Sequence, residues 1–323
     1  MTRKNPHLAG IQAALTSALF LGLAPVFGKQ AILAGLSPLV VVSLRTGLAV
    51  VLLAAGMFAF RRRYFYIYPA GLLGCCLAGG INGIGSLLYY SALGRLNAGL
   101  GQLLYGLYPL FVAVFMGLDR QPPSRLTAFR LALVLPALYL LVADGLQPVD
   151  WVGAGLMLAA ALLYALHLPI NQRVLYDMPA PTVTLYTLLA MGAVVGLAYL
   201  LSGSPLTQPA PTISPQAWQA VLALTLVTFL SRLTLFVGVK NLGGLQTAML
   251  GLSEMLVTVL VSHLWLGERF SPQQWLGAAL LVAGLGLVGL EKAPLKKQAA
   301  GGWLSWLRPP GIPANLRERR GAG

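Results

Sequence analysis

Three charged side chains lie at least seven residues from either end of long apolar stretches of this sequence: Arg45, Arg232 and Glu254. A charge within a bilayer costs roughly 2.5 to 3.5 kcal/mol on insertion scales, so each of these side chains should face protein or water. Each is therefore a candidate for binding a charged solute. Glu254 can meet a substrate ammonium group or exchange a proton for it, and Arg232 can bind a carboxylate or a phosphate.

Each charge also has an interpretation that involves no substrate. Arg232 can form a structural ion pair with Glu254, or it can extend its guanidinium group to the membrane surface. Arg45 can bind carbonyl groups freed at a helix end, or contribute to an outer gate.

The uncharged candidates for substrate binding are polar residues in the same apolar stretches: His167, Asn82, Gln102 and Gln246. Such residues often only form hydrogen bonds across a helix interface, which remains an alternative for each of them. His167 can titrate in the physiological range or remain neutral and hydrogen-bonded.

Tyrosines complete the candidate site, chiefly Tyr105, Tyr108 and Tyr164. Tyr105 and Tyr108 are one helical turn apart, so they can line a cavity with an amphipathic wall. Anchoring at the membrane interface is the alternative for some tyrosines of the chain.

The sequence lacks the residue patterns expected for metal binding, redox chemistry and catalysis. The two cysteines, Cys75 and Cys76, are adjacent, which favours packing over a structural disulfide. The sequence has no CxxC pair, no cluster of His and acidic residues and no glycine-rich phosphate loop, so we expect no metal, no cofactor and no ATP hydrolysis. With three His and eight acidic residues and no plausible triad, we expect no enzyme and no catalytic residues.

The elements that must position these residues are ten apolar stretches, each about the ~20 residues that a membrane-spanning helix requires. They cover residues 8–28, 38–60, 69–91, 98–118, 125–143, 151–170, 182–202, 216–239, 243–266 and 272–290. The sequence therefore predicts an all-α polytopic membrane protein with ten transmembrane helices.

Basic residues predict how these helices are oriented. With a cytoplasmic N-terminus, 17 of the 22 basic residues fall in the inner connections and tails. These 17 are Arg3, Lys4, Arg61, Arg62, Arg63, Arg120, Arg125, Arg130, Arg173, Lys240, Lys292, Lys296, Lys297, Arg308, Arg317, Arg319 and Arg320. The positive-inside rule then places both termini in the cytoplasm, and it explains the net charge of +14 without a nucleic-acid partner.

An internal repeat divides the chain into two halves. Residues 90–96 and 106–109 align with residues 236–242 and 251–254, an offset of 145 to 146, while Pro25 and Lys29 align with Pro169 and Arg173. Because each half has five helices, the second half enters the membrane in the opposite orientation. We expect a first repeat over 1–145, a second over 146–291, and a basic cytoplasmic tail over 292–323 that is disordered and lies against anionic lipid head groups.

Particular motifs resemble the ten-helix, EamA-type branch of the drug/metabolite transporter superfamily. The most specific is the run from Leu264 to Pro272, Leu-Trp-Leu-Gly-Glu-Arg-Phe-Ser-Pro, followed by Trp275-Leu276-Gly277. Arg45 and the Tyr108-Pro109 pair support the match in the first half. The resemblance implies a central cavity between the third, fourth, eighth and ninth helices, with the first, second, sixth and seventh as moving gates. Proline kinks at Pro25 and Pro169, together with Lys29 and Arg45, are the gating candidates.

These inferences predict a secondary transporter in a bacterial plasma membrane, acting as a monomer or homodimer. It exports a small metabolite, an amino acid or a related amphipathic compound, by alternating access, and protons are a further candidate partner beside membrane lipids. A phosphorylated or cationic drug-like solute is the alternative within transport. A membrane scaffold without a permeation path is the alternative from another class.

Overall fold

In the computed structural model of the 323-residue chain, the described residues are 6–93, 95, 96, 101, 104–142, 150–202, 214–257, 260, 271–287 and 303–307. Within these ranges the side chains of seven helical residues are left undescribed: Pro25, Val26, Lys29, Leu33, Leu93, Leu141 and Val142. Every regular element in the described ranges is a helix.

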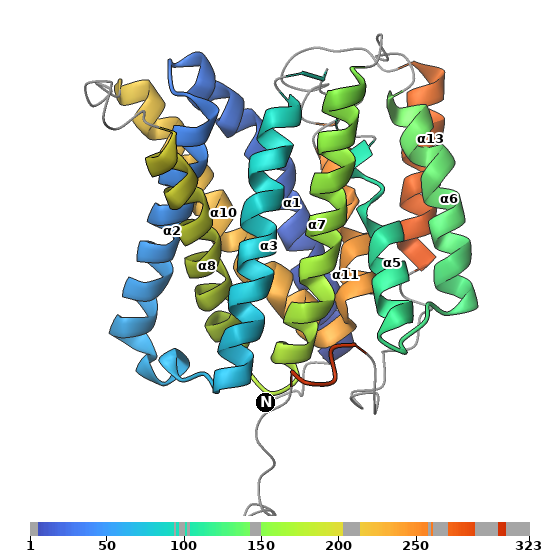
Figure 1. The fold of residues 1–323 in the computed structure, drawn as a ribbon. Helices are drawn as coiled ribbons and strands as arrows, with labels where there is room; N and C mark the ends of the chain where they lie inside the picture. Colours follow the sequence, from blue (N-terminus) through green and yellow to red (C-terminus); the bar gives the residue numbers. More distant parts are fainter. Residues whose placement is uncertain are drawn as a thin grey trace, which may run out of the picture.

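The helices form a bundle of long, roughly parallel and antiparallel segments (Figure 1). They are α1 (Pro6–Leu33), α2 (Pro38–Phe60), α3 (Pro69–Leu93), α5 (Tyr108–Leu118), α6 (Arg125–Val142), α7 (Trp151–Leu175), α8 (Ala180–Leu201), α10 (Pro215–Leu242), α11 (Gly244–Gly251) and α13 (Pro272–Gly286), with a short 3-10 helix, η1 (Arg62–Phe65). We call the end of the bundle at which α1 and α3 begin the N-side, and the opposite end the far side.

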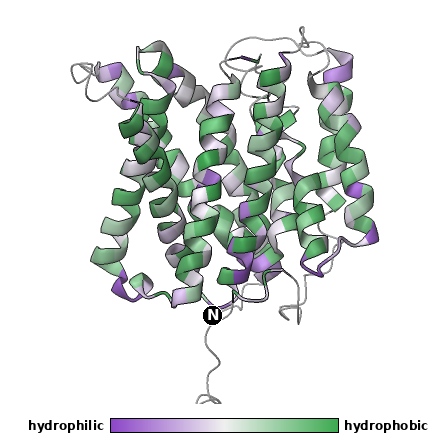
Figure 2. Cartoon of the chain, in the orientation of Figure 1, coloured by the Kyte–Doolittle hydropathy of each residue, from purple (hydrophilic) through white to green (hydrophobic). Residues whose placement is uncertain are grey.

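Six of these helices are long and apolar enough to cross a membrane. They lie at Pro6–Ala24, Pro38–Phe60, Pro69–Ala92, Trp151–Leu175, Ala180–Leu201 and Pro215–Leu242. Figure 2 shows hydrophobic residues along the middle of the helices and hydrophilic residues gathered mainly at their ends. The all-helical membrane fold is thereby confirmed, whereas the number of ten spans remains a prediction.

Four helices that start on the far side share a capped beginning. Ser37, Ser214 and Ser271 each precede a proline at the first helical position and accept a backbone N–H with the side-chain oxygen, and Asp150 accepts two N–H groups at the start of α7. Proline fits this position because its missing N–H would have no helical partner there. These caps fix where the predicted segments begin.

Two predicted helices are interrupted at equivalent places of the repeat. The segment predicted over 98–118 has a turn at Gly106 and Leu107 before α5, and the segment predicted over 243–266 has a turn at Leu252 after α11. The repeat offset of 145 aligns Leu107 with Leu252. Broken helices at matching positions of two inverted repeats are typical of transporters, where they meet near the middle of the membrane.

The helix packing also follows the repeat. The most extensive contacts join α1 to α10 and α3 to α7, which are equivalent pairs in the two halves, while α6 packs on α13 and α2 on α8. These last two pairs each join a helix to its own counterpart. An inverted repeat therefore describes both the sequence and the contacts.

Candidate functional site

A line of five tyrosine rings runs through the interior of the bundle. It consists of Tyr89 and Tyr90 from α3, Tyr105 and Tyr108 on either side of the first helix break, and Tyr164 from α7. Ring centroids are 5.4 Å apart for Tyr89 and Tyr90, 4.9 Å for Tyr89 and Tyr105, and 5.0 Å for Tyr108 and Tyr164. These separations and the tilted or edge-to-face geometry are those of favourable aromatic pairs.

Each end of this line carries an arginine. The guanidinium carbon of Arg45 lies 5.2 Å from the Tyr90 ring, and that of Arg232 lies 5.8 Å from the Tyr164 ring, both within cation–π range. Arg45 Nε and Arg232 Nη1 are buried and make no hydrogen bond in the described part of the chain. A buried donor without a partner is costly, so these two nitrogens are candidates for binding an anion.

Glu254 follows the second helix break directly and faces the same region. Its side chain is half-buried. Arg232 and the rings of Tyr105, Tyr108 and Tyr164 are within electrostatic range of its carboxylate. A β-carbon added at Gly22 of α1 would lie 2.8 Å from the Glu254 carbonyl oxygen, so α1 approaches the break closely.

His167 completes this central cluster, defined as Tyr89, Tyr105, Tyr108, Tyr164, His167, Arg232 and Glu254. The His167 ring is 4.7 Å from the Tyr164 ring, and its Nδ1 bonds to the Tyr164 carbonyl oxygen. A carbonyl only accepts, so Nδ1 carries the proton. Nε2 is buried and has no hydrogen-bond partner among the described residues, so it too is available to a ligand.

The two tyrosines beside the first helix break have different environments. Tyr108 is 2% exposed, and its hydroxyl donates to the Ala248 carbonyl of α11 over 2.7 Å. Tyr105 is half-buried and contacts other rings. Tyr108 therefore joins the two halves of the protein, whereas Tyr105 presents a face to the interior.

Other predicted site residues lie elsewhere. Gln246 accepts a hydrogen bond from Arg130 Nη1 over 2.6 Å and donates to Thr127, so it belongs to a buried network near the N-side. Asn82 donates to the Met191 sulfur at the interface of α3 and α8. Neither contacts the central cluster through a described hydrogen bond.

The remaining predictions concern gates. Gln102 lies outside the described residues, and the side chains of Pro25 and Lys29 are not described. Pro169 is buried, and α7 continues as a helix through it to Leu175. The ion pair between Arg232 and Glu254, which the sequence left as an alternative, is not among the described contacts of Arg232.

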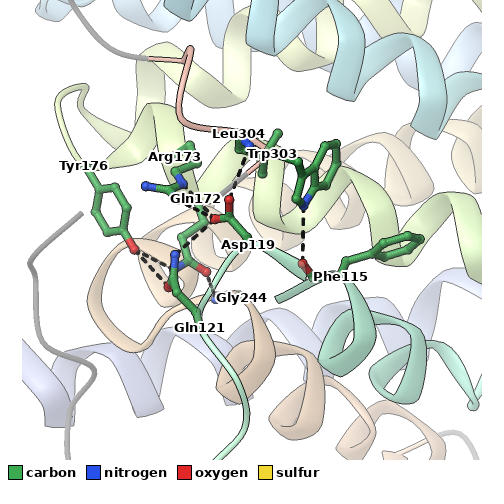
Figure 3. Close-up of polar contacts among 9 residues, drawn as sticks. All are labelled: Phe115, Asp119, Gln121, Gln172, Arg173, Tyr176, Gly244, Trp303 and Leu304. Carbon is green, nitrogen blue, oxygen red and sulfur yellow. Dashed lines mark hydrogen bonds and ion pairs between the residues drawn. The ribbon is translucent and has the colours of Figure 1, made fainter. Parts of the chain in front are cut away.

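A second polar cluster, which we call the N-side lock, closes the N-side end of the bundle (Figure 3). Asp119, at the end of α5, accepts two hydrogen bonds from Arg173 of α7, with Arg173 Nη2 at 2.7 Å and Nε at 2.8 Å from Oδ2. The two side chains are 2% and 1% exposed. Gln121 also donates to Oδ2. A buried pair in which two guanidinium N–H groups meet one carboxylate oxygen is strongly held as long as both partners remain.

Glutamines extend the N-side lock to α11. Gln172 Nε2 donates to Gln121 Oε1 and to the Tyr176 hydroxyl, while Gln172 Oε1 accepts from the Gly244 backbone N–H over 2.5 Å. Arg120 adopts a φ of +58°, which reverses the chain after α5 and brings Gln121 next to Asp119. A left-handed non-glycine residue costs of order 1 kcal/mol and is common at functional sites.

The N-side lock was not predicted from the sequence. Arg173 was predicted to lie in an inner connection, yet the structure buries this residue inside α7. One signal was available, because the repeat aligns Arg173 with Lys29, which was proposed for gating. Its partner Asp119 was noted only as the acidic residue that follows the fourth predicted helix, as the resemblance implies.

Comparisons with known proteins agree with this architecture. The EamA-like transporter family matches residues 8–143 and 151–290, one match for each half, which confirms the resemblance noted from the sequence. Among solved structures, one titled "Crystal structure of protein" superposes with a TM-score of 0.71 at 18% identity, covering 89% of this chain and 97% of its own. At this identity the likeness shows a shared fold. No curated protein matches the chain.

Proposed function

The chain belongs to the EamA-like transporter family, and from this premise we propose that it is a secondary transporter for a small zwitterionic metabolite, an amino acid or a related amphipathic compound. Its substrate binds at the central cluster and crosses the membrane by alternating access. The direction we propose is export across a bacterial plasma membrane.

The single observation that carries this proposal is the composition of the central cluster. Arg232 supplies a donor without a hydrogen-bond partner, Glu254 supplies a carboxylate, and the two act on each other electrostatically. A zwitterion satisfies both, with its carboxylate on Arg232 and its ammonium group on Glu254. Tyr105 and Tyr164 offer aromatic surface for an apolar side chain.

The packing at the two ends supports a state that is closed on the N-side and open on the far side. Every residue of α7 from His167 to Leu175 is buried, and so is every residue of α11. At the far side, by contrast, a pocket of about 380 Å³ lies between α1 and α10. With the N-side in the cytoplasm, as the basic residues predict, this state faces outward.

Reporter fusions test that orientation. Fusions after residues 65, 122 and 300 should report a cytoplasmic location, and fusions after residues 147 and 208 an external one. An external signal at 65 together with a cytoplasmic signal at 208 would reverse the assignment of the two sides.

Solute counterflow in proteoliposomes tests the substrate class. The panel pairs each amino acid with two analogues, its N-acetyl derivative and its decarboxylated amine. If Arg232 and Glu254 bind the two charges of a zwitterion, both analogues should exchange at least about tenfold more slowly than the parent. Exchange of the free amine alone would favour a cationic drug-like substrate. Exchange of sugar phosphates alone would favour a phosphorylated one.

Arg232 provides the matched variants for this assay. Arg232→Lys keeps the charge but loses the planar fork of donors, so it should retain partial exchange, whereas Arg232→Met should lose nearly all of it. If no solute of any class exchanges with the unmodified protein, and the Arg232→Met protein is equally stable, the scaffold alternative is favoured.

A further inference from the structure

A short segment of the C-terminal tail is seated against the N-side of the bundle. Residues 303–307, Trp-Leu-Ser-Trp-Leu, form a turn in which Leu304 and Leu307 are 1% and 0% exposed. The two leucines pack with Ala78 of α3 and Ile170 of α7. Gly74 of α3 leaves the necessary room, because a β-carbon there would lie 2.9 Å from a methyl group of Leu307.

Polar contacts fix the same segment to α5. The Leu304 backbone N–H donates to Asp119 Oδ1 over 3.3 Å, and the Trp303 indole N–H donates to the Phe115 carbonyl over 3.4 Å. Asp119 is also the carboxylate that accepts Arg173 through its other oxygen. Figure 3 shows both contacts on one carboxylate. The segment therefore binds directly to the N-side lock, and it spans α3, α5 and α7.

This contact lies outside the inverted repeat. The N-side ends of α3 and α7 correspond to the far-side ends of α10 and α1, because Pro69 aligns with Pro215 and Pro169 with Pro25. At that equivalent position the structure has the pocket of about 380 Å³, lined by residues such as Gln30, Gln219 and Ala220. One end of the repeat is therefore covered by a tail segment that the repeat itself does not supply.

A contact present in only one of two conformations shifts the equilibrium between them. Opening the N-side requires the ends of α3, α5 and α7 to separate around Asp119 and Arg173, and the seated segment bridges all three helices. If the three helices separate, Leu304 and Leu307 of the segment lose their buried contacts.

We propose that residues 303–307 form a latch that seats in the groove between α3, α5 and α7 and stabilises the N-side-closed state. The inference rests on the proposed alternating access. In an inverted repeat the two end states are nearly equivalent, so a one-sided latch sets which of them predominates. The latch makes the N-side-closed state the resting state.

The test measures how fast a buried cysteine reacts from the N-side. In the full chain with Cys75→Ala and Cys76→Ala, Ala248→Cys serves as reporter, since Ala248 of α11 is 1% exposed behind the N-side lock. Inverted and right-side-out vesicles are treated with a membrane-impermeant thiol reagent. The Leu304→Ala, Leu307→Ala double variant should label about tenfold faster from the N-side, because the open state gains population. Trp306→Ala is the matched control, since it removes a larger side chain that is 48% exposed, and its labelling should not change.

A truncation keeps the proposal testable if the double variant folds poorly. A chain that ends at residue 302 should show the same rise, and a synthetic peptide of residues 303–323, added on the N-side, should reverse it. An unchanged labelling rate in both the double variant and the truncation overturns the latch. An equal rise with Trp306→Ala also overturns it, because the segment would then act through the membrane surface instead of the groove. The assay uses no substrate, so a failed counterflow experiment leaves its result interpretable.

Discussion

The N-side end of α7 and the far-side end of α1 are equivalent in the repeat but differ in their surroundings. In α7, nine consecutive residues from His167 to Leu175 are buried, and Arg173 pairs with Asp119. In α1, Gln30 is exposed and lines a pocket with Phe27 and Ala34. The two equivalent ends therefore differ in burial: α7 is enclosed at the N-side, and α1 borders a pocket at the far side.

Buried polar contacts mark the difference between the two ends. Both ends have the same helix pairs, α3 with α7 and α10 with α1. In the described part of the chain, the N-side adds a buried carboxylate and guanidinium pair, two glutamines and a backbone N–H, which join α5, α7 and α11. The far-side ion pair that the structure describes, Arg95 with Asp150, is exposed.

The largest effect should follow from breaking the buried pair. Arg173→Met leaves the Asp119 carboxylate buried without its main partner, which should lower the free energy of unfolding by about 3 kcal/mol. Thermal or denaturant unfolding in detergent micelles measures the change. The double variant Asp119→Leu, Arg173→Met removes both charges and should recover most of the loss. If the single and double variants are equally unstable, packing volume and not the unpaired charge is responsible.

A smaller effect should separate Tyr108 from Tyr105. Tyr108→Phe removes the donor to the Ala248 carbonyl and should destabilise the protein by about 1 kcal/mol, with substrate preference unchanged. Tyr105→Ala should instead weaken exchange of bulky solutes more than that of small ones, because it removes an aromatic face from the interior. Unfolding and counterflow are measured on both variants. If Tyr108→Phe changes substrate preference and Tyr105→Ala only lowers stability, the two tyrosines have the opposite roles.

The smallest effect belongs to the far-side pair. The Gly153 backbone N–H, with further help from Arg95 and the Val152 N–H, holds the pKa of Asp150 below its ordinary value. Because the pKa of Asp150 is lower in the folded state than in the unfolded state, its ionised carboxylate stabilises the fold at pH values above the unfolded-state pKa. This contribution is lost as the pH falls through the folded-state pKa. Arg95→Ala should leave the unfolding midpoint unchanged at neutral pH, since the pair is exposed. Asp150→Asn should lower the midpoint slightly at pH 7, and the difference from the unmodified protein should shrink as the pH falls below 3.8, the ordinary pKa of the carboxyl group.

The comparison also shows what the sequence could predict. Apolar length predicted where the helices lie, because that signal is local. The turns that interrupt the segments predicted over 98–118 and 243–266 were not predicted. The partners of polar residues are not local. Gln246 was predicted to bind substrate but bonds to Arg130, and Asp119 was not predicted to meet Arg173, since both contacts join residues far apart in the chain. The seat of Leu304 and Leu307 likewise depends on space that Gly74 leaves in a distant helix.

Glu254 carries the central claim, that an ionisable group at the second helix break takes part in transport. Counterflow and net pH-driven flux are measured with Glu254→Gln, which keeps the shape and hydrogen bonding of the side chain but removes its charge. The matched control is Ser253→Ala, whose hydroxyl only bonds to the Leu250 carbonyl of its own helix turn. The account predicts that Glu254→Gln folds normally and loses net transport or its dependence on pH, while Ser253→Ala transports at the normal rate. A Glu254→Gln protein that transports at the normal rate with an unchanged pH profile would contradict it.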